Sequence, residues 1–99
     1  MTVMEITVLP IGTGSTSLSA AVAKAVKAAK EAGYEPRVTP MGTVVTGDTP
    51  ALLSLASRMH AAALAGGARR VYTTIRLDER TDKQESLDER VAAVEDKAR

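Results

Sequence analysis

Two repeating patterns of apolar residues alternate along this 99-residue chain, and their order constrains the fold more than any other feature. Apolar residues recur at every second position over residues 2–11 and 71–78, which is typical of strands with one buried face. They recur at helical spacing over residues 18–32 and from Asp48 to about Ala65. Two short β-prone pieces lie between the helices, at 37–39 and 43–46. The order is therefore strand, helix, strand, strand, helix, strand.

This order predicts a single domain over residues 1–99, a ferredoxin-like βαββαβ α+β sandwich. Two helices would cover one face of a four-stranded antiparallel sheet. The other face would be of mixed polarity and would carry these residues: Val3, Glu5, Thr7, Leu9, Tyr72, Thr74 and Arg76. It could meet solvent, a further helix or the sheet of another subunit.

Local signals set the expected ends of the two central helices. A hydroxyl group from Ser15–Ser17 is expected to cap the first helix, and Gly33 to end it. Asp48 and Pro50 form a typical opening for the second helix. The strands at 37–39 and 43–46 would form an irregular hairpin that turns through Pro40–Gly42.

An extra helix is predicted at the C-terminus. Ser86 to Glu89 fit a capping box, and apolar residues follow at helical spacing: Leu87, Val91, Val94 and Ala98. This narrow apolar stripe needs a surface to dock on, either on the sheet of the same subunit or on a neighbouring subunit.

The core must be built from small and β-branched residues, because large aromatic side chains are almost absent. The chain has no Phe and no Trp, and its two aromatic residues are Tyr34 and Tyr72. One subunit of this size can bury only a modest core. We therefore expect a homo-oligomer, a tetramer built as a dimer of dimers.

Charge and composition exclude several function classes. Thirteen Lys and Arg against twelve Asp and Glu give a net charge of +1, too little for a dedicated nucleic-acid-binding module. Cysteine is absent, which excludes disulfides and thiolate catalysis. No apolar run approaches the roughly 18 residues of a membrane span, and no N-terminal signal pattern is present. We expect a cytoplasmic protein that binds neither nucleic acid nor membrane.

No constellation of catalytic or metal-binding side chains emerges from the sequence. His60, the single histidine, has no nucleophile or metal ligand at a recognised spacing, and we expect a partly exposed helix residue. Carboxylates crowd into residues 78–85, where they alternate with basic residues as in a solvated loop. The sequence therefore predicts no catalytic residue, no metal site and no cofactor.

The segment Gly12–Ser17 is the first candidate binding loop. It follows a strand and opens a helix, where free N–H groups and the helix dipole can hold an anion. Ser17 takes the place of the third glycine of a dinucleotide fingerprint, and the Gly-Lys-Ser/Thr ending of a phosphate loop is missing. Ligand contact and a capped tight turn therefore stay open as alternatives of equal weight.

The turn Thr39–Thr43 is the second candidate. It combines two hydroxyls, the thioether of Met41 and exposed backbone, a set that suits a small ring with polar edges. The alternative is a plain hairpin turn in which Gly42 supplies an unusual backbone angle. The residues alone favour that alternative.

Three segments together resemble the small thiamine-binding protein family over nearly the whole chain. They are Leu-Pro-Ile-Gly-Thr-Gly-Ser-Thr-Ser at 9–17, Thr-Pro-Met-Gly-Thr-Val-Val at 39–45 with Gly47 following, and Arg-Arg-Val-Tyr-Thr-Thr-Ile-Arg-Leu-Asp-Glu-Arg at 69–80. Each motif alone is weak, but their order and spacing are jointly specific.

The resemblance implies a ferredoxin-like subunit that assembles into dimers and tetramers through its sheets and binds thiamine or its hydroxymethylpyrimidine moiety. The family's distinctive positions map onto these ligand-binding candidates: Gly12, Ser15, Thr16, Ser17, Met41, Gly42, Thr43, Thr73 and Thr74. Among them we expect Thr43 to hydrogen-bond the ligand and Met41 to pack on its ring. Ser15 or Thr16 would supply a second polar contact.

The leading hypothesis is therefore a non-catalytic binding protein for this small-molecule ligand, acting as a carrier, buffer or sensor. One alternative is a regulatory module for another small metabolite. Another is an enzyme of cofactor metabolism that holds a phosphate in the Gly12–Ser17 loop. A purely structural assembly is the last.

Overall fold

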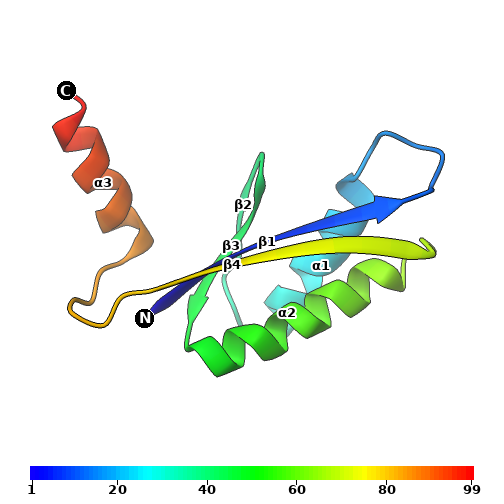
Figure 1. Cartoon of the computed structure of the whole chain (residues 1–99), viewed down its shortest axis with the longest axis horizontal. Coiled ribbons are helices and arrows are strands. Elements are labelled where there is room, and N and C mark those ends of the chain that lie inside the picture. The colour runs from blue at the N-terminus through cyan, green and yellow to red at the C-terminus, as the bar shows by residue number, and fades with distance from the viewer.

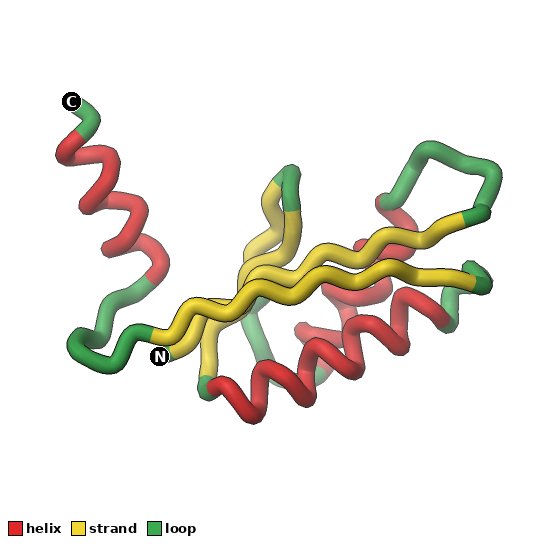
Figure 2. Tube along the Cα trace, viewed as in Figure 1, coloured by secondary structure: helices red, strands yellow, loops and turns green.

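The computed structural model describes all residues from Met1 to Arg99. Its helices and strands follow one another in the predicted order. The elements are β1 (Thr2–Ile11), α1 (Ser19–Glu31), β2 (Arg37–Thr39), β3 (Gly42–Gly47), α2 (Thr49–Leu64), β4 (Arg70–Glu79) and α3 (Leu87–Lys97). Figures 1 and 2 show α1 and α2 beside the sheet and α3 apart from it at one end. The ferredoxin-like α+β fold with an extra C-terminal helix is confirmed.

The sheet has the strand order β2-β3-β1-β4, and every neighbouring pair is antiparallel. In this register Ile6 of β1 lies opposite Thr43 of β3 and Ile75 of β4. Residues that lie opposite one another share a face of the sheet, so Thr43 faces the same side as the buried Ile6. The strand β4 forms one edge of the sheet.

The opposite face is not covered by α1 or α2. There Glu5 lies opposite Arg76, with 3.5 Å between Oε1 and Nη1, and Thr7 lies opposite Thr74. Tyr72 lies opposite Leu9 on the same face. The predicted mixed composition of this uncovered face is therefore confirmed.

The core lies between the sheet and the two helices α1 and α2. Its eleven residues are small or aliphatic and include no aromatic side chain: Met4, Ile6, Val8, Ala25, Ala29, Val45, Leu52, Leu55, Ala56, Met59 and Ala63. Tyr34 packs against this cluster from its margin. The two helices pack on each other, and alanine at the contact lets them approach closely.

The predicted caps are correct only in part. Leu18 is the N-cap of α1 and makes no capping hydrogen bond, so the expected hydroxyl cap is wrong. The Ser15 hydroxyl instead accepts from the backbone N–H of Ser17 at 3.0 Å, within the loop. Asp48 occupies the N-cap of α2, but its side chain makes no capping bond. At α3 the Ser86 hydroxyl does accept from the N–H of Glu89, at 3.1 Å.

Gly33 ends α1 as predicted. Its φ of +91° lies in the left-handed region that favours glycine. The N–H of Gly33 donates to the Lys30 carbonyl at 3.0 Å, and that of Tyr34 donates to the Ala29 carbonyl at 3.1 Å. The reversal of the chain directs it into β2.

None of the helices is both long and apolar enough to cross a membrane.

Candidate functional site

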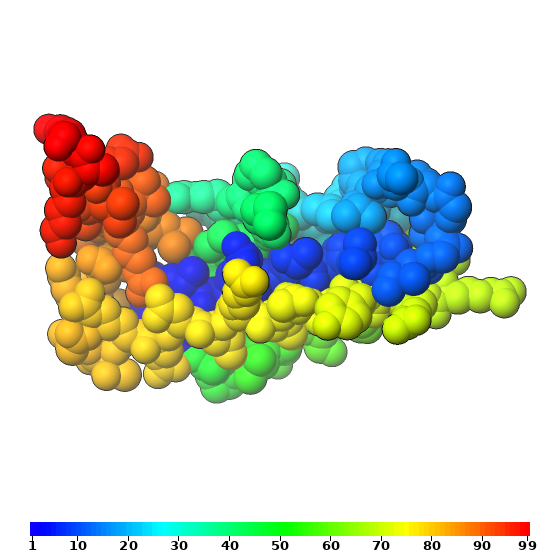
Figure 3. Space-filling model, turned by 45° about the horizontal axis from the view of Figure 1, so that its top comes forward, coloured from blue at the N-terminus to red at the C-terminus, as the bar shows by residue number.

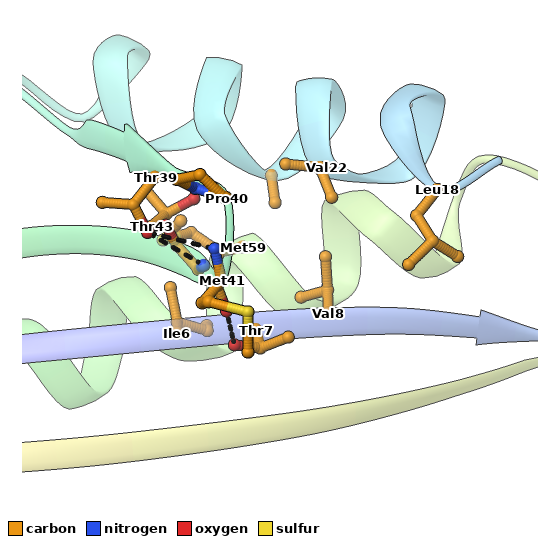
Figure 4. A pocket seen from close by; sticks show the side chains of 12 residues that line it. Ile6, Thr7, Val8, Leu18, Val22, Thr39, Pro40, Met41, Thr43 and Met59 are labelled. Carbon is orange, nitrogen blue, oxygen red and sulfur yellow. Dashed lines mark hydrogen bonds between the residues drawn. The ribbon is translucent and has the colours of Figure 1, made fainter.

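A cavity of about 170 Å³ opens between the β2–β3 turn, the middle of β1 and the start of α1 (Figure 4). The cavity is lined mainly by apolar side chains and threonines: Ile6, Thr7, Val8, Leu18, Val22, Ala25, Thr39, Pro40, Met41, Gly42, Thr43 and Met59. We call it the hairpin cavity. No charged side chain lines it, so its interior is neutral.

The turn that closes the hairpin cavity is held by two threonine hydroxyls. The Thr39 hydroxyl donates to the Gly42 carbonyl at 2.8 Å and accepts from the backbone N–H groups of Met41 and Gly42, at 3.3 and 3.2 Å. The Thr7 hydroxyl, from β1, donates to the Met41 carbonyl at 3.1 Å. Both hydroxyls are therefore engaged in fixing the shape of the turn.

Gly42 lies in close approach to side chains of β1, and its backbone angle is not unusual. Its φ is not positive, so the alternative explanation for this glycine is wrong. A Cβ at this position would lie 3.0 Å from Glu5 Cγ and 3.0 Å from Thr7 Oγ1. The missing side chain lets the hairpin turn lie against β1, which forms one wall of the cavity.

The Thr43 hydroxyl is the one side-chain hydroxyl of the cavity that the turn does not use. Thr43 is only 3% exposed, and it takes part in none of the side-chain hydrogen bonds of the chain. The Thr43 oxygen is not sealed off, because the one fully buried side-chain N or O atom without a partner in the chain is Arg90 Nε. The hydroxyl is therefore available to a polar group inside the cavity.

Two methionines bound the hairpin cavity at different depths. Met59 of α2 is fully buried, whereas Met41 is 79% exposed at the turn (Figure 4). An unbranched thioether adapts to irregular shapes and packs well against the face of a ring. Met41 is thus free to adjust over a molecule that enters the cavity.

The structure brings together three of the predicted site residues and separates the others. Met41, Gly42 and Thr43 all line the hairpin cavity. Ser15 and Ser17 line a second cavity of about 260 Å³, together with Lys24 of α1 and residues at the end of α2.

The remaining residues of the first loop do not reach the hairpin cavity either. Gly12 lines an open depression beside Gly66 and Gly67. Thr16 is exposed and lines neither the hairpin cavity nor the second cavity. The two candidate segments therefore do not meet in one pocket.

The two threonines of β4 lie elsewhere. Thr73 shares the helix-facing side of the sheet with Val8, and its hydroxyl is 2.6 Å from Nδ1 of His60. Thr74 lies on the uncovered face opposite Thr7. Neither residue lines the hairpin cavity. His60 is half-buried, as predicted, and bonds α2 to β4.

The sequence interpretation missed the wall that α1 contributes. Leu18, Val22 and Ala25 line the hairpin cavity, and they belong to the apolar stripe that the sequence showed at helical spacing. That stripe has a second role here, because Leu18 and Val22 are only half-buried and lie beside the core residue Ala25. Pairing the stripe with the β2–β3 turn required the tertiary structure.

The chemistry that this arrangement offers is binding. The lining supplies apolar contact, one unpaired hydroxyl and the backbone of the turn, and no group that exchanges a proton near neutral pH. Across the whole chain, no three His, Cys, Asp or Glu side chains lie together as a metal site would require.

Comparison with known proteins places the chain among relatives of nearly the same length. The family model described as "thiamine-binding protein" matches residues 4–95. A UPF0045 protein of Methanothermobacter thermautotrophicus is 40% identical over 98 residues, covering 98% of this chain and 99% of the relative. The UPF0045 protein YqgV of Bacillus subtilis is 34% identical, over 95% of this chain and 94% of its own.

A solved structure agrees with the fold over almost its full length. The crystal structure of a hypothetical protein from Methanocaldococcus jannaschii superposes with a TM-score of 0.85 at 30% identity, covering 95% of both chains.

Proposed function

Because the chain belongs to the thiamine-binding protein family, we propose that it is a non-catalytic protein that binds thiamine or its hydroxymethylpyrimidine moiety in the hairpin cavity. In the cell it would act as a carrier, buffer or sensor of this compound.

The observation that carries the proposal is the unpaired hydroxyl of Thr43. It belongs to a residue that is only 3% exposed, and it lies in a neutral cavity whose other hydroxyls already have partners. A pyrimidine ring matches this cavity in two ways. Its flat faces are apolar, and its edge carries nitrogen atoms and an amino group that can bond the hydroxyl. We assign Thr43 to bond that polar edge and Met41 to pack on the face.

The size and charge of the cavity favour the pyrimidine ring over the whole of thiamine. Pockets for drug-sized ligands are roughly 300–1,000 Å³, so a cavity of about 170 Å³ suits a single small ring. The second ring of thiamine is cationic, and no carboxylate lines the cavity. Thiamine would enter with its pyrimidine, leaving the charged ring at the mouth beside Met41.

In this proposal the backbone of the β2–β3 turn makes the second polar contact with the ligand. Ser15 and Thr16 were the expected partners, but Ser15 lines the neighbouring cavity and Thr16 is exposed to solvent. The absence of a proton-transfer group from the cavity lining supports a binding role over catalysis.

We further propose a cytoplasmic homo-oligomer, a tetramer formed as a dimer of dimers.

A thermal-shift panel tests the proposed function. Hydroxymethylpyrimidine, thiamine and the phosphate esters of both would be compared at equal concentrations, because a ligand that binds only the folded state raises the melting temperature. Hydroxymethylpyrimidine should give the largest shift. The phosphate esters should give no additional shift, since no cation lines the hairpin cavity.

The other outcomes count against the proposal in distinguishable ways. A shift that appears only with phosphate esters would favour the Gly12–Ser17 loop and the enzyme hypothesis. No shift with any pyrimidine at millimolar concentration would contradict the binding function. A shift with an unrelated neutral metabolite alone would favour the regulatory module.

A further inference from the structure

The hairpin cavity has two chemically different sides. The turn Thr39–Thr43 forms a polar side, with the Thr43 hydroxyl and the backbone of the turn. Val8 of β1 and Leu18 and Val22 of α1 form the other side, and Figure 4 shows these three side chains together, away from Thr43. Their side chains contain only carbon and hydrogen, so we call this part of the cavity the apolar side.

The strand register separates the two sides along β1. Thr43 lies opposite Ile6, where the pairing of β1 with β3 ends. Val8 lies two residues further along β1 on the same face of the sheet, and it is only 4% exposed. Leu18 and Val22, one helical turn apart, line the cavity together with Val8. Figure 3 shows the β2–β3 turn (green) and the start of α1 (light blue) one after the other along β1 (dark blue).

The apolar side distinguishes substituents by their polarity. A carbonyl oxygen or an amino group placed there would lose its hydrogen bonds to water, and no side chain of the apolar side offers a new partner. A methyl group would instead remove apolar surface from water and gain van der Waals contact. The cavity therefore favours a ring that carries a polar edge towards Thr43 and a methyl group at the opposite edge.

Hydroxymethylpyrimidine has this distribution of groups. Its methyl group and its hydroxymethyl group lie on opposite carbons of the ring, and its amino group is next to the hydroxymethyl group. With the amino group at Thr43 and the hydroxymethyl group towards Met41, the methyl group points to the apolar side. The pyrimidine nucleobases carry a carbonyl oxygen in place of that methyl group. A position at which all of them differ from hydroxymethylpyrimidine therefore falls on the apolar side.

We propose that Val8, Leu18 and Val22 form a methyl subsite that selects hydroxymethylpyrimidine and rejects the pyrimidine nucleobases. The inference rests on the proposed function and adds the basis of its specificity. A methyl group and a carbonyl oxygen are similar in size, so shape alone does not separate these ligands. Discrimination comes instead from the unpaired oxygen that a nucleobase would bury, which is specificity by exclusion of the wrong ligand.

Calorimetric titration of the full-length wild type with three ligands tests the methyl subsite. The ligands are hydroxymethylpyrimidine, its analogue with hydrogen in place of the methyl group, and hydroxymethylcytosine, which keeps the amino and hydroxymethyl groups but carries the carbonyl oxygen. The analogue without the methyl group should bind about tenfold more weakly than hydroxymethylpyrimidine. Hydroxymethylcytosine should bind about 10- to 100-fold more weakly, because its oxygen is left without a partner.

A pair of variants on α1 shows whether the apolar side causes the difference. Val22→Thr keeps the shape and places a hydroxyl on the apolar side, so it should narrow the Kd ratio of hydroxymethylcytosine to hydroxymethylpyrimidine by about two- to tenfold. Val26→Thr is the matched control, because Val26 is also half-buried on α1 but does not line the cavity. It should keep the wild-type ratio. Circular dichroism would check that both variants are folded.

Equal affinity of the wild type for hydroxymethylpyrimidine and hydroxymethylcytosine would overturn the methyl subsite and leave the proposed function intact. An unchanged ratio in a folded Val22→Thr protein, or the same change in Val26→Thr, would overturn it as well. If hydroxymethylpyrimidine does not bind the wild type at millimolar concentration, the proposed function itself is contradicted, and the methyl subsite with it. The two failures are therefore distinguishable.

Discussion

The Thr7 hydroxyl donates a hydrogen bond to the Met41 carbonyl oxygen, with 3.1 Å between the two oxygens. This contact joins the central strand β1 to the turn that closes the hairpin cavity. The next residue, Gly42, lies so close to β1 that a Cβ would be 3.0 Å from the same Thr7 oxygen. The shape of the cavity therefore depends on the fit of the turn against one threonine.

The substitution Gly42→Ala should destabilise the protein by about 1–3 kcal/mol, because the added methyl would crowd the side chains of Glu5 and Thr7. It should also weaken ligand binding, since the turn carries Met41 and Thr43. Urea unfolding at fixed protein concentration measures the first effect and calorimetric titration the second. Thr7→Ala removes one of the crowded atoms, so the double variant should lose less stability than the two single losses added together. Strict additivity would contradict this account of Gly42.

The bond between His60 and Thr73 predicts a structural role for a residue that the family resemblance placed in the site. Thr73→Val should lower the free energy of unfolding by about 0.5–1.5 kcal/mol, because it removes the partner of Nδ1 at 2.6 Å. Ligand affinity should stay unchanged. Thr74→Val is the matched control, since its hydroxyl makes no hydrogen bond, and should alter stability by no more than about 0.5 kcal/mol. If Thr73→Val lost ligand affinity but kept its stability, Thr73 would belong to the binding site and this account would be contradicted.

The arrangement of strands and helices was predictable because each element carries its own periodic signal. The alternation along β1 and β4 and the stripes of α1 and α2 have only one common packing solution, the split β-α-β sandwich. The glycine and proline punctuation placed the ends of the elements within a few residues. The mixed polarity of the uncovered face followed from the same alternation.

The cavity was less predictable because it depends on contacts between distant segments. The turn at Thr39–Thr43 was a candidate on residue type, but its opposite wall comes from α1, a pairing that no local pattern encodes. The expected hydroxyl cap of α1 is absent: Leu18 is the N-cap, while the Ser15 hydroxyl accepts from the Ser17 N–H and the Ser17 hydroxyl bonds that of Ser19. The apolar stripe of α3 signalled a need for a partner but not its position.

The free energy of unfolding should depend on the ionisation of Glu79 at acid pH. Hydrogen bonds from Thr49 at 2.5 Å and from Thr2 at 3.2 Å hold the pKa of this carboxyl below its ordinary value of 4.5. A lowered pKa in the folded state means that the carboxylate stabilises the fold above about pH 4.5. This stabilisation is lost as the pH falls through the folded-state pKa.

Thr49→Val removes the largest cause of that shift. The variant should be less stable than the wild type at pH 7, and the difference should narrow as the pH falls from 5 towards 3, in urea unfolding at about half-unit steps. Thr81→Val, which removes an exposed hydroxyl without a hydrogen bond, should show no such dependence on pH. A difference for Thr49→Val that stays constant with pH would contradict the link to Glu79.

The central claim, that the hairpin cavity binds a pyrimidine through Thr43, is tested most directly by calorimetric titration of hydroxymethylpyrimidine into wild type and Thr43→Val. The substitution keeps the shape and removes the hydroxyl, so the affinity should fall by up to about tenfold, the equivalent of 0.5–1.5 kcal/mol for one neutral hydrogen bond. Thr16→Val, in the loop outside the cavity, should bind like the wild type. Absence of binding to the wild type at millimolar concentration, or equal affinity for a correctly folded Thr43→Val protein, would contradict the account.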